Sequence, residues 1–268
     1  MDDLKFDQNE YLGRIKYSGE VKSSIEHLYA IHHAQFFTIP FENFDICLSR
    51  AINLEPDHLF QKLVKSNRGG YCFELNGLFL RALKSFGFEA RALLARVHFS
   101  GEPTGRGHQI SLVTIQGKQW IVDVGFGKDT PHCPIPLIIN QPSTINGQTF
   151  RLVEDQYYSF MLQSKTSEKW EDLYSFDLEY VCPGDIAYGN HFTSTHPGSF
   201  FVSARVAALP IDNGVITLNN KTLKKTLKGK ETQIQLREDE TYIESLKTYF
   251  GIKLNVSYKA LKPFTDTC

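Results

Sequence analysis

A pair of adjacent glycines that leads directly into an amphipathic helix constrains this chain more than any other feature. The segment reads Arg68-Gly69-Gly70-Tyr71-Cys72-Phe73-Glu74-Leu75-Asn76. The apolar residues that follow recur with helical spacing and predict a helix with one buried stripe. They are Leu75, Leu78, Phe79, Ala82, Leu83 and Phe86. Cys72 precedes Leu75 by three residues, so we expect it in the first turn, on the same buried face.

The expected position of Cys72 suits a nucleophile. The first turn of a helix has unpaired backbone N–H groups and a partial positive charge, which favour a thiolate over a thiol. Two adjacent glycines permit positive φ and allow another molecule to approach the backbone closely. A buried structural cysteine is the other interpretation, and the residues of this segment alone leave both open.

Length, charge and cysteine content narrow the class of protein. The 268 residues exceed one average core and predict two or three subdomains that share a cleft. Because 29 basic residues balance 30 acidic ones, we expect no nucleic-acid partner. The first residues show no apolar signal segment and the chain has no run of 18 apolar residues, so we expect a cytoplasmic protein that does not enter a membrane. Five cysteines without a C-x-x-C pair predict a reduced protein without a zinc ribbon.

The hydrophobic period changes near residue 88 and divides the chain. A capping box at Ser23–Glu26 predicts a helix that stops before Pro40, and Pro56–Val64 predicts another. The adjacent His32 and His33 have no partner four residues away, so we expect no metal there. Beyond residue 88 the pattern favours strands at 88–97, 109–115, 119–124, 151–174, 200–209 and 215–218, and helices at 183–195 and 238–250.

Two of these strands present a histidine and an aspartate. His108 closes a glycine-containing loop, and Asp123 lies at the far end of the hairpin that turns around Gln116-Gly117-Lys118. A two-residue turn pairs Asp123 with either Ile110 or Leu112, and both registers place His108 and Asp123 on one face of the sheet. A three-residue loop without a bulge would place them on opposite faces.

Cys72, His108 and Asp123 together provide the groups that nucleophilic catalysis requires. A thiolate attacks, an imidazole accepts and returns the proton, and a carboxylate fixes the imidazole tautomer and stabilises its charged form. Taken singly, His108 could be a core or loop histidine and Asp123 a turn carboxylate. Their occurrence beside the Cys72 motif favours the catalytic interpretation.

Three motifs in this order resemble the arylamine N-acetyltransferases. They are Ile39-Pro40-Phe41-Glu42-Asn43, Arg68–Asn76 and Val122-Asp123-Val124-Gly125-Phe126-Gly127. The resemblance implies an α+β fold with an N-terminal helical bundle, a central β-barrel and a C-terminal α/β lid, around a catalytic core like that of the cysteine proteases. With the change of period, it suggests a helical domain at 1–87 that contains the nucleophile, a barrel domain at 88–190 that contains the histidine and aspartate, and a lid at 191–268.

The resemblance also implies roles for particular residues. In that family the motif cysteine is the nucleophile, the histidine is the base and the aspartate orients it, which correspond here to Cys72, His108 and Asp123. The family's loop before the histidine contributes to coenzyme A binding, and its glycine-flanked phenylalanine lines the acceptor pocket. The corresponding residues are Thr104 and Gly105 for coenzyme A and Phe126 for the acceptor, and Phe192 is a further candidate substrate contact. Lys128 and Thr130 replace an arginine and an aromatic residue of animal members, which leaves acceptor specificity open.

The implied activity is acetyl transfer from acetyl-CoA to the nitrogen of arylamines, arylhydrazines or N-hydroxyarylamines, by a ping-pong mechanism through an acetyl-cysteine. Acetyl-CoA is then a co-substrate, no cofactor is tightly bound, and we expect a monomer or a homodimer. A transglutaminase- or peptidase-like thiol enzyme is the alternative, because both use Cys, His and Asp or Asn in this order. The short interval from Cys72 to His108 argues against papain-like peptidases. A non-catalytic binding protein with the same scaffold is a second alternative, which acetyl turnover would test.

Overall fold

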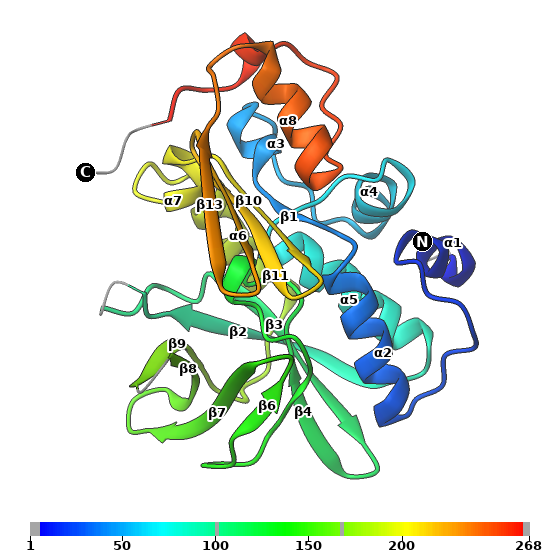
Figure 1. The fold of residues 1–268 in the computed structure, drawn as a ribbon. Helices are drawn as coiled ribbons and strands as arrows, with labels where there is room; N and C mark the ends of the chain where they lie inside the picture. Colours follow the sequence, from blue (N-terminus) through cyan, green and yellow to red (C-terminus); the bar gives the residue numbers. More distant parts are fainter. Residues whose placement is uncertain (1–5, 100–101, 167–168, 265–268) are drawn as a thin grey trace.

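Helices from the first third of the chain pack against a strongly curved sheet. A second, smaller sheet lies above the curved sheet in the view of Figure 1. The structure is a computed structural model that describes residues 6–99, 102–166 and 169–264. Its mixed helices and sheets agree with the predicted α+β class. No helix in these ranges is long and apolar enough to cross a bilayer.

Helix α5 is the centre of the helical region. Its apolar stripe packs on the outer face of the curved sheet, where Leu75 and Phe79 join Val113 and Val122 in one core. The other helices surround it. The predicted capping box at Ser23–Glu26 is wrong by one residue: Ser24 caps α2, and its hydroxyl accepts a hydrogen bond from the N–H of His27. The bounds are α1 Gln8–Arg14, α2 Ile25–Phe36, α3 Phe44–Cys47, α4 Pro56–Phe60, the π-helical turn η1 Gln61–Lys65, and α5 Cys72–Ser85.

The curved sheet has eight antiparallel strands in the order β5-β4-β3-β2-β9-β8-β7-β6, and it closes almost into a barrel. Its interior is a second core of aliphatic and aromatic side chains that includes Leu93, Ile110, Leu152 and Tyr174. The bounds are β2 Glu89–Val97, β3 His108–Ile115, β4 Lys118–Val122, η2 Gly127–Asp129, β5 Ile135–Pro136, β6 Ser143–Ile145, β7 Gln148–Asp155, β8 Ser159–Thr166 and β9 Lys169–Phe176.

The hairpin between β3 and β4 has the first of the two predicted registers. Ile115 pairs with Lys118, so the turn residues are Gln116 and Gly117, and both have positive φ as a tight hairpin turn requires. Continuing this register places Asp123 opposite Ile110. His108 therefore lies on the same face of the sheet as Asp123.

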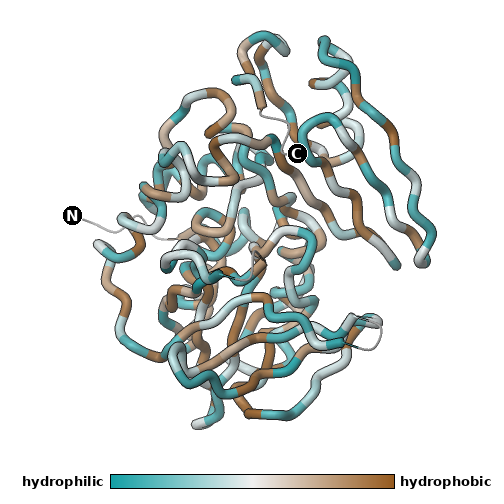
Figure 2. Tube along the Cα trace, turned by 90° about the vertical axis from the view of Figure 1, so that its left-hand side faces the viewer, coloured by the Kyte–Doolittle hydropathy of each residue, from teal (hydrophilic) through white to brown (hydrophobic). Residues whose placement is uncertain are grey.

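The smaller sheet combines residues from both ends of the chain. Strand β1, from the first third, pairs antiparallel with β10, and α8 packs against the sheet through buried Tyr242, Leu246 and Phe250. Hydrophobic and hydrophilic residues alternate along the strands of this sheet (Figure 2). The bounds are β1 Phe41–Glu42, α6 Pro183–Thr195, α7 Phe200–Ser203, β10 Val206–Ile211, β11 Gly214–Asn219, β12 Thr222–Leu227, β13 Lys230–Gln235, α8 Glu240–Phe250 and η3 Tyr258–Ala260.

The strand predicted at residues 200–209 is wrong in its first half. Phe200–Ser203 forms the short helix α7, and β10 begins only at Val206. Ser199 precedes α7 and its hydroxyl donates a hydrogen bond to the carbonyl of Thr193, which ties this turn to the end of α6. The apolar pattern therefore reflects packing of a helical turn. The domain limits at 87 and 190 stay a prediction, and β1 shows that the first segment also contributes to the sheet of the last.

Candidate active site

The glycine pair is required by close contact within the chain itself. Neither glycine has positive φ. A Cβ on Gly69 would lie 2.2 Å from the carbonyl oxygen of Pro40, and one on Gly70 would lie 2.8 Å from Cβ of Glu74. The expected use of positive φ is therefore absent, and the glycines instead let the loop pass against β1 and the first turn of α5.

Buried charges fix this loop. The Glu42 carboxylate accepts hydrogen bonds from Nε and Nη2 of Arg68, at 2.7 and 3.0 Å, and from the backbone N–H of Gly69 at 3.1 Å. Burial opposes ionisation of Glu42, but the charges of Arg68 and Lys62 hold its pKa below the usual value. Lys62 also pairs with Glu74, whose second oxygen accepts from the N–H of Tyr71, the residue before Cys72. The backbone that enters α5 is thus held from two sides.

The three predicted catalytic side chains come together at the first turn of α5. His108 Nε2 lies 2.7 Å from Asp123 Oδ2, and the Cys72 sulfur lies 3.8 Å from the carbonyl oxygen of Gly107, the residue before His108. All three side chains are buried, with Cys72 at 3% exposure. Because Nε2 is bound to Asp123, Nδ1 is the nitrogen left to exchange a proton with the thiol.

The electrostatics of the site favour a charged imidazole. Burial alone would lower the pKa of His108, but the Asp123 carboxylate and the Cys72 side chain outweigh it and raise the pKa to about 10. The same pair holds the pKa of Asp123 below its usual range, against the effect of burial. A protonated imidazole beside the sulfur is the arrangement that stabilises a cysteine thiolate.

Asn76 is a site residue that the sequence reasoning missed. Its Nδ2 donates to Asp123 Oδ1 at 2.9 Å and to the carbonyl of Gln109 at 2.7 Å, and its Oδ1 accepts from the N–H of Val124 at 3.0 Å. Asp123 Oδ1 accepts a second hydrogen bond from the N–H of Gly125 at 2.8 Å. The carboxylate is therefore fixed at both oxygens. The position of Asn76 one helical turn after Cys72 was the signal that could have identified it.

His32 also supports the site, from α2. Its Nε2 lies 2.8 Å from the carbonyl oxygen of Asp123, while its Nδ1 is buried without a hydrogen-bond partner among the described residues. Burial lowers the pKa of His32 to about 4. The ring is therefore neutral at pH 7 and donates Nε2–H to the carbonyl. No spacing in the sequence connects His32 with Asp123.

This buried histidine predicts an acid-sensitive fold. The pKa of His32 rises from about 4 in the folded chain to roughly 6.5 in the unfolded chain, so unfolding takes up a proton between these values. Stability is therefore lost as pH falls from about 6.5 toward 4. We expect His32→Gln, which keeps a donor and cannot ionise, to weaken this pH dependence in urea unfolding curves.

His32→Ala serves as the comparison variant. It leaves the carbonyl of Asp123 buried without this donor, so we expect it to lower the free energy of unfolding at pH 7 by about 1–3 kcal/mol. Equal pH dependence in the wild type and His32→Gln would contradict the assignment of a neutral, buried His32.

Of the predicted binding residues, Phe126 lies next to His108 of the triad, whereas Thr104 and Gly105 lie in the loop that precedes His108. The ring of Phe126 is 4.8 Å from that of His108 and 5.0 Å from that of Tyr174, centroid to centroid. The Thr104 hydroxyl accepts from the N–H of Val97 at 3.0 Å, in the loop that precedes His108. Space beside Gly105 is open.

Phe192 is not brought to the triad by any described contact. Its side chain is 54% exposed and stacks on His196, with ring centroids 4.4 Å apart. The residues of α6 that do approach the site are Asn190, which accepts a hydrogen bond from the Tyr71 hydroxyl, and Thr193, which lies against Gly107. Within the described ranges, no three His, Cys, Asp or Glu side chains are arranged to hold a metal ion.

Comparison with known proteins gives one consistent result. The family model described as N-acetyltransferase matches residues 24–259. The chain is 38% identical over 216 residues to the arylamine N-acetyltransferase of Escherichia coli, which covers 79% of this chain and 76% of the relative. The fold is similar to the arylamine N-acetyltransferase of Salmonella typhimurium, with TM-score 0.89, 33% identity, and coverage of 93% and 92% of the two chains. It is also similar to the Mycobacterium marinum enzyme solved in complex with CoA, with TM-score 0.86, 32% identity, and coverage of 92% and 93%. The chain belongs to the arylamine N-acetyltransferase family.

Proposed function

We propose that this protein transfers the acetyl group of acetyl-CoA to the nitrogen of aromatic amines, with Cys72, His108 and Asp123 as the catalytic triad. The observation on which this depends is the Cys72 thiol at the start of α5, next to an imidazole bound to Asp123 at 2.7 Å. The family membership supports the donor and acceptor classes, since its named members are arylamine N-acetyltransferases and one of them is solved with CoA.

In the first half-reaction, the Cys72 sulfur attacks the thioester carbonyl of acetyl-CoA. The proton of the thiol has passed to His108, whose charge Asp123 stabilises. As the tetrahedral intermediate collapses, the bond from carbon to the coenzyme A sulfur breaks, and His108 returns the proton to that sulfur. Acetyl-Cys72 and free coenzyme A result. One thioester has replaced another, so neither side of the equilibrium is strongly favoured.

In the second half-reaction, the amine nitrogen attacks acetyl-Cys72 and the carbon–sulfur bond of the intermediate breaks. His108 accepts the proton that the nitrogen loses, and the Cys72 thiolate is released. Aromatic amines are largely uncharged at neutral pH, so they can enter an apolar site without the desolvation of a cation. Phe126, next to His108, offers a ring on which an aromatic acceptor can pack.

The acceptor range is part of the proposal. Arylhydrazines present a nitrogen nucleophile, as arylamines do. The relative from Salmonella typhimurium is named as both an arylamine N-acetyltransferase and an N-hydroxyarylamine O-acetyltransferase, so an N-hydroxyarylamine could also receive the acetyl group on its hydroxyl oxygen. We also propose that Thr104 and Gly105 contact coenzyme A, since they lie in the loop that leads to His108. Phe192 stays a candidate contact for large acceptors, because its ring faces solvent.

We further propose that the protein acts in the cytoplasm as a monomer or homodimer. The four described cysteines are free thiols, as a reducing compartment requires. The domain limit at 87 coincides with the change from helices to barrel strands, whereas the limit at 190 falls within α6, and both limits are part of this proposal.

Intact-mass measurement tests the reaction directly. After mixing with acetyl-CoA and no amine, we expect one added acetyl group on the protein, which a later addition of an aromatic amine removes. Acetylation without transfer to the amine would contradict the second half-reaction. The absence of a mass increase would contradict the first and favour the thiol hydrolase or binding-protein alternatives.

A further inference from the structure

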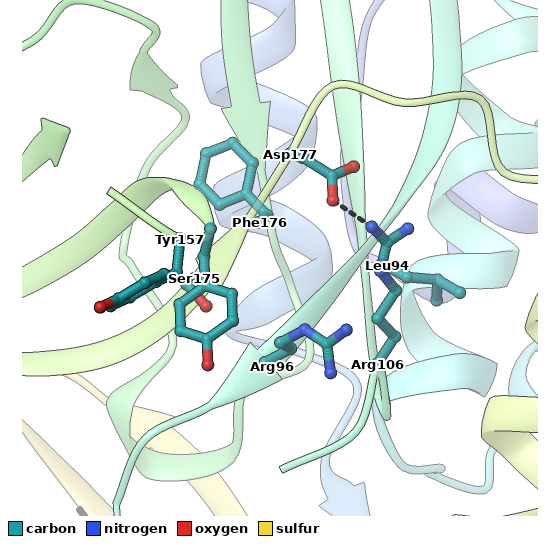
Figure 3. A pocket seen from close by; sticks show the side chains of 8 residues that line it. Leu94, Arg96, Arg106, Tyr157, Ser175, Phe176 and Asp177 are labelled. Atoms are coloured by element: carbon teal, nitrogen blue, oxygen red, sulfur yellow. Dashed lines mark hydrogen bonds and ion pairs between the residues drawn. The ribbon is translucent and has the colours of Figure 1, made fainter. Parts of the chain in front are cut away.

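A hollow of about 130 Å³ lies at the end of β2, beside the loop that leads into His108 (Figure 3). Segments far apart in the sequence form its wall. The residues that matter for its chemistry are Arg96, Arg106, Tyr157, Tyr158, Ser175 and Asp177. None of them has a role in the triad, and two of them are cations.

The two arginines leave the hollow with excess positive charge. Arg106 pairs with Asp177. Arg96 takes part in none of the ion pairs formed among the described residues, and its Nη1 donates only a 3.3 Å hydrogen bond to the carbonyl of Thr104. One carboxylate thus faces two guanidinium groups. A planar guanidinium without a carboxylate partner is well suited to hydrogen-bond two phosphate oxygens.

Aromatic rings border this charge. The guanidinium of Arg96 lies over the ring of Tyr158, 5.7 Å from its centroid. The neighbouring Tyr157 is 77% exposed. A large exposed aromatic ring near an arginine that has no carboxylate partner in the described ranges offers a surface on which a nucleic base can stack.

The loop next to the hollow also reaches the nucleophile. Arg106 is followed by Gly107, whose carbonyl lies 3.8 Å from the Cys72 sulfur. Arg96 binds the same loop through Thr104. A molecule that places a thioester at Cys72 and an anionic group at the arginines would therefore extend along this loop. Acetyl-CoA has this composition, with a thioester at one end of a flexible arm, and phosphates and an adenine at the other.

We propose that this hollow binds a phosphate of acetyl-CoA through Arg96, with Arg106 as a second cation and Tyr157 as a stacking surface for the adenine. The inference rests on the proposed function and adds to it the site that recognises the nucleotide. Both the 3′-phosphate and the diphosphate of acetyl-CoA fit this chemistry. A donor that lacks the 3′-phosphate distinguishes between them.

The test compares Arg96→Gln with the wild type on two acetyl donors. We expect the KM for acetyl-CoA to rise about tenfold with kcat nearly unchanged, since one charge-assisted contact is lost. The KM for p-nitrophenyl acetate, which has no nucleotide, should not change. Arg151→Gln is the matched control, because Arg151 lies on β7, does not line the hollow, and is stacked over Trp170 and hydrogen-bonded to Gln163. It should leave both values as in the wild type.

Acetyl-dephospho-CoA then identifies the phosphate. If the effect of Arg96→Gln disappears with this donor, Arg96 binds the 3′-phosphate; if the effect persists, Arg96 binds the diphosphate. Tyr157→Ala should raise the KM for both nucleotide donors several-fold. An unchanged KM for acetyl-CoA in Arg96→Gln, or an equal rise for p-nitrophenyl acetate, would overturn the proposal. Failure of the wild type to accept acetyl from acetyl-CoA, while still using p-nitrophenyl acetate, would instead overturn the proposed donor and this site with it.

Discussion

Cys72→Ala is expected to abolish both half-reactions, with a loss of at least about 10⁴-fold in turnover. Without the sulfur, no group in the site can hold the acetyl between the two substrates. His108 and Asp123 alone could at best assist direct attack by the amine. The intact mass of the variant should therefore stay unchanged after incubation with acetyl-CoA.

Two measurements keep this result interpretable. The first is the unfolding temperature of Cys72→Ala, which should be close to that of the wild type, because alanine is a good helix former and Cys72 begins α5. The second is Cys182→Ser, a control at a more accessible cysteine that precedes α6. This variant should still gain one acetyl group. Acetylation of Cys72→Ala would remove Cys72 from the mechanism.

Asp123→Asn is expected to slow acetylation of Cys72 by about 10³- to 10⁴-fold while the fold persists. Oδ1 already accepts from Asn76 and Gly125, so the new amide would keep that oxygen and present its NH₂ group to His108. An amide donor at Nε2 forces that nitrogen to be the acceptor. The ring proton then moves to Nδ1, the nitrogen next to the thiol, and His108 can no longer accept the proton of Cys72.

The rate of the first half-reaction measures this effect best. Rapid mixing with acetyl-CoA, acid quench and mass analysis give the acetylation rate without amine. Asp172→Asn is a suitable control, because Asp172 is an exposed carboxylate on β9 that accepts from Gln163. It should acetylate as fast as the wild type. A near-normal rate in Asp123→Asn would exclude the carboxylate from the mechanism.

Local sequence patterns were sufficient to predict where the three residues of the proposed triad lie. Helical spacing placed Cys72 on the buried face of α5, and a two-residue turn placed His108 and Asp123 on one face of the β3–β4 hairpin. Both inferences depend on side-chain periodicities of neighbouring residues, which the backbone geometry fixes. The α+β class followed from the same periodicities and from the motif resemblance.

Other parts of the site depend on contacts between distant segments, and no local pattern encodes them. His32 contacts the carbonyl of Asp123, which is 91 residues away in the sequence. The glycine at position 69 is required because the backbone of Pro40 leaves no room for a Cβ there. Phe200–Ser203 has the apolar pattern of a strand and forms a helix against α6. In each case packing partners outweigh a weak local preference.

The sequence by itself determined where the groups of the proposed triad lie in the local structure: a cysteine at a helix start, and a histidine and an aspartate on one face of a hairpin. Only the tertiary structure decided how these groups are supported, with Asn76 and His32 fixing Asp123, and Arg96 placed over Tyr158 beside the loop that leads into His108. The physical reason is that hydrogen bonds and charge pairs act over a few ångströms. Which distant side chains come within that range is set by how helices and sheets pack.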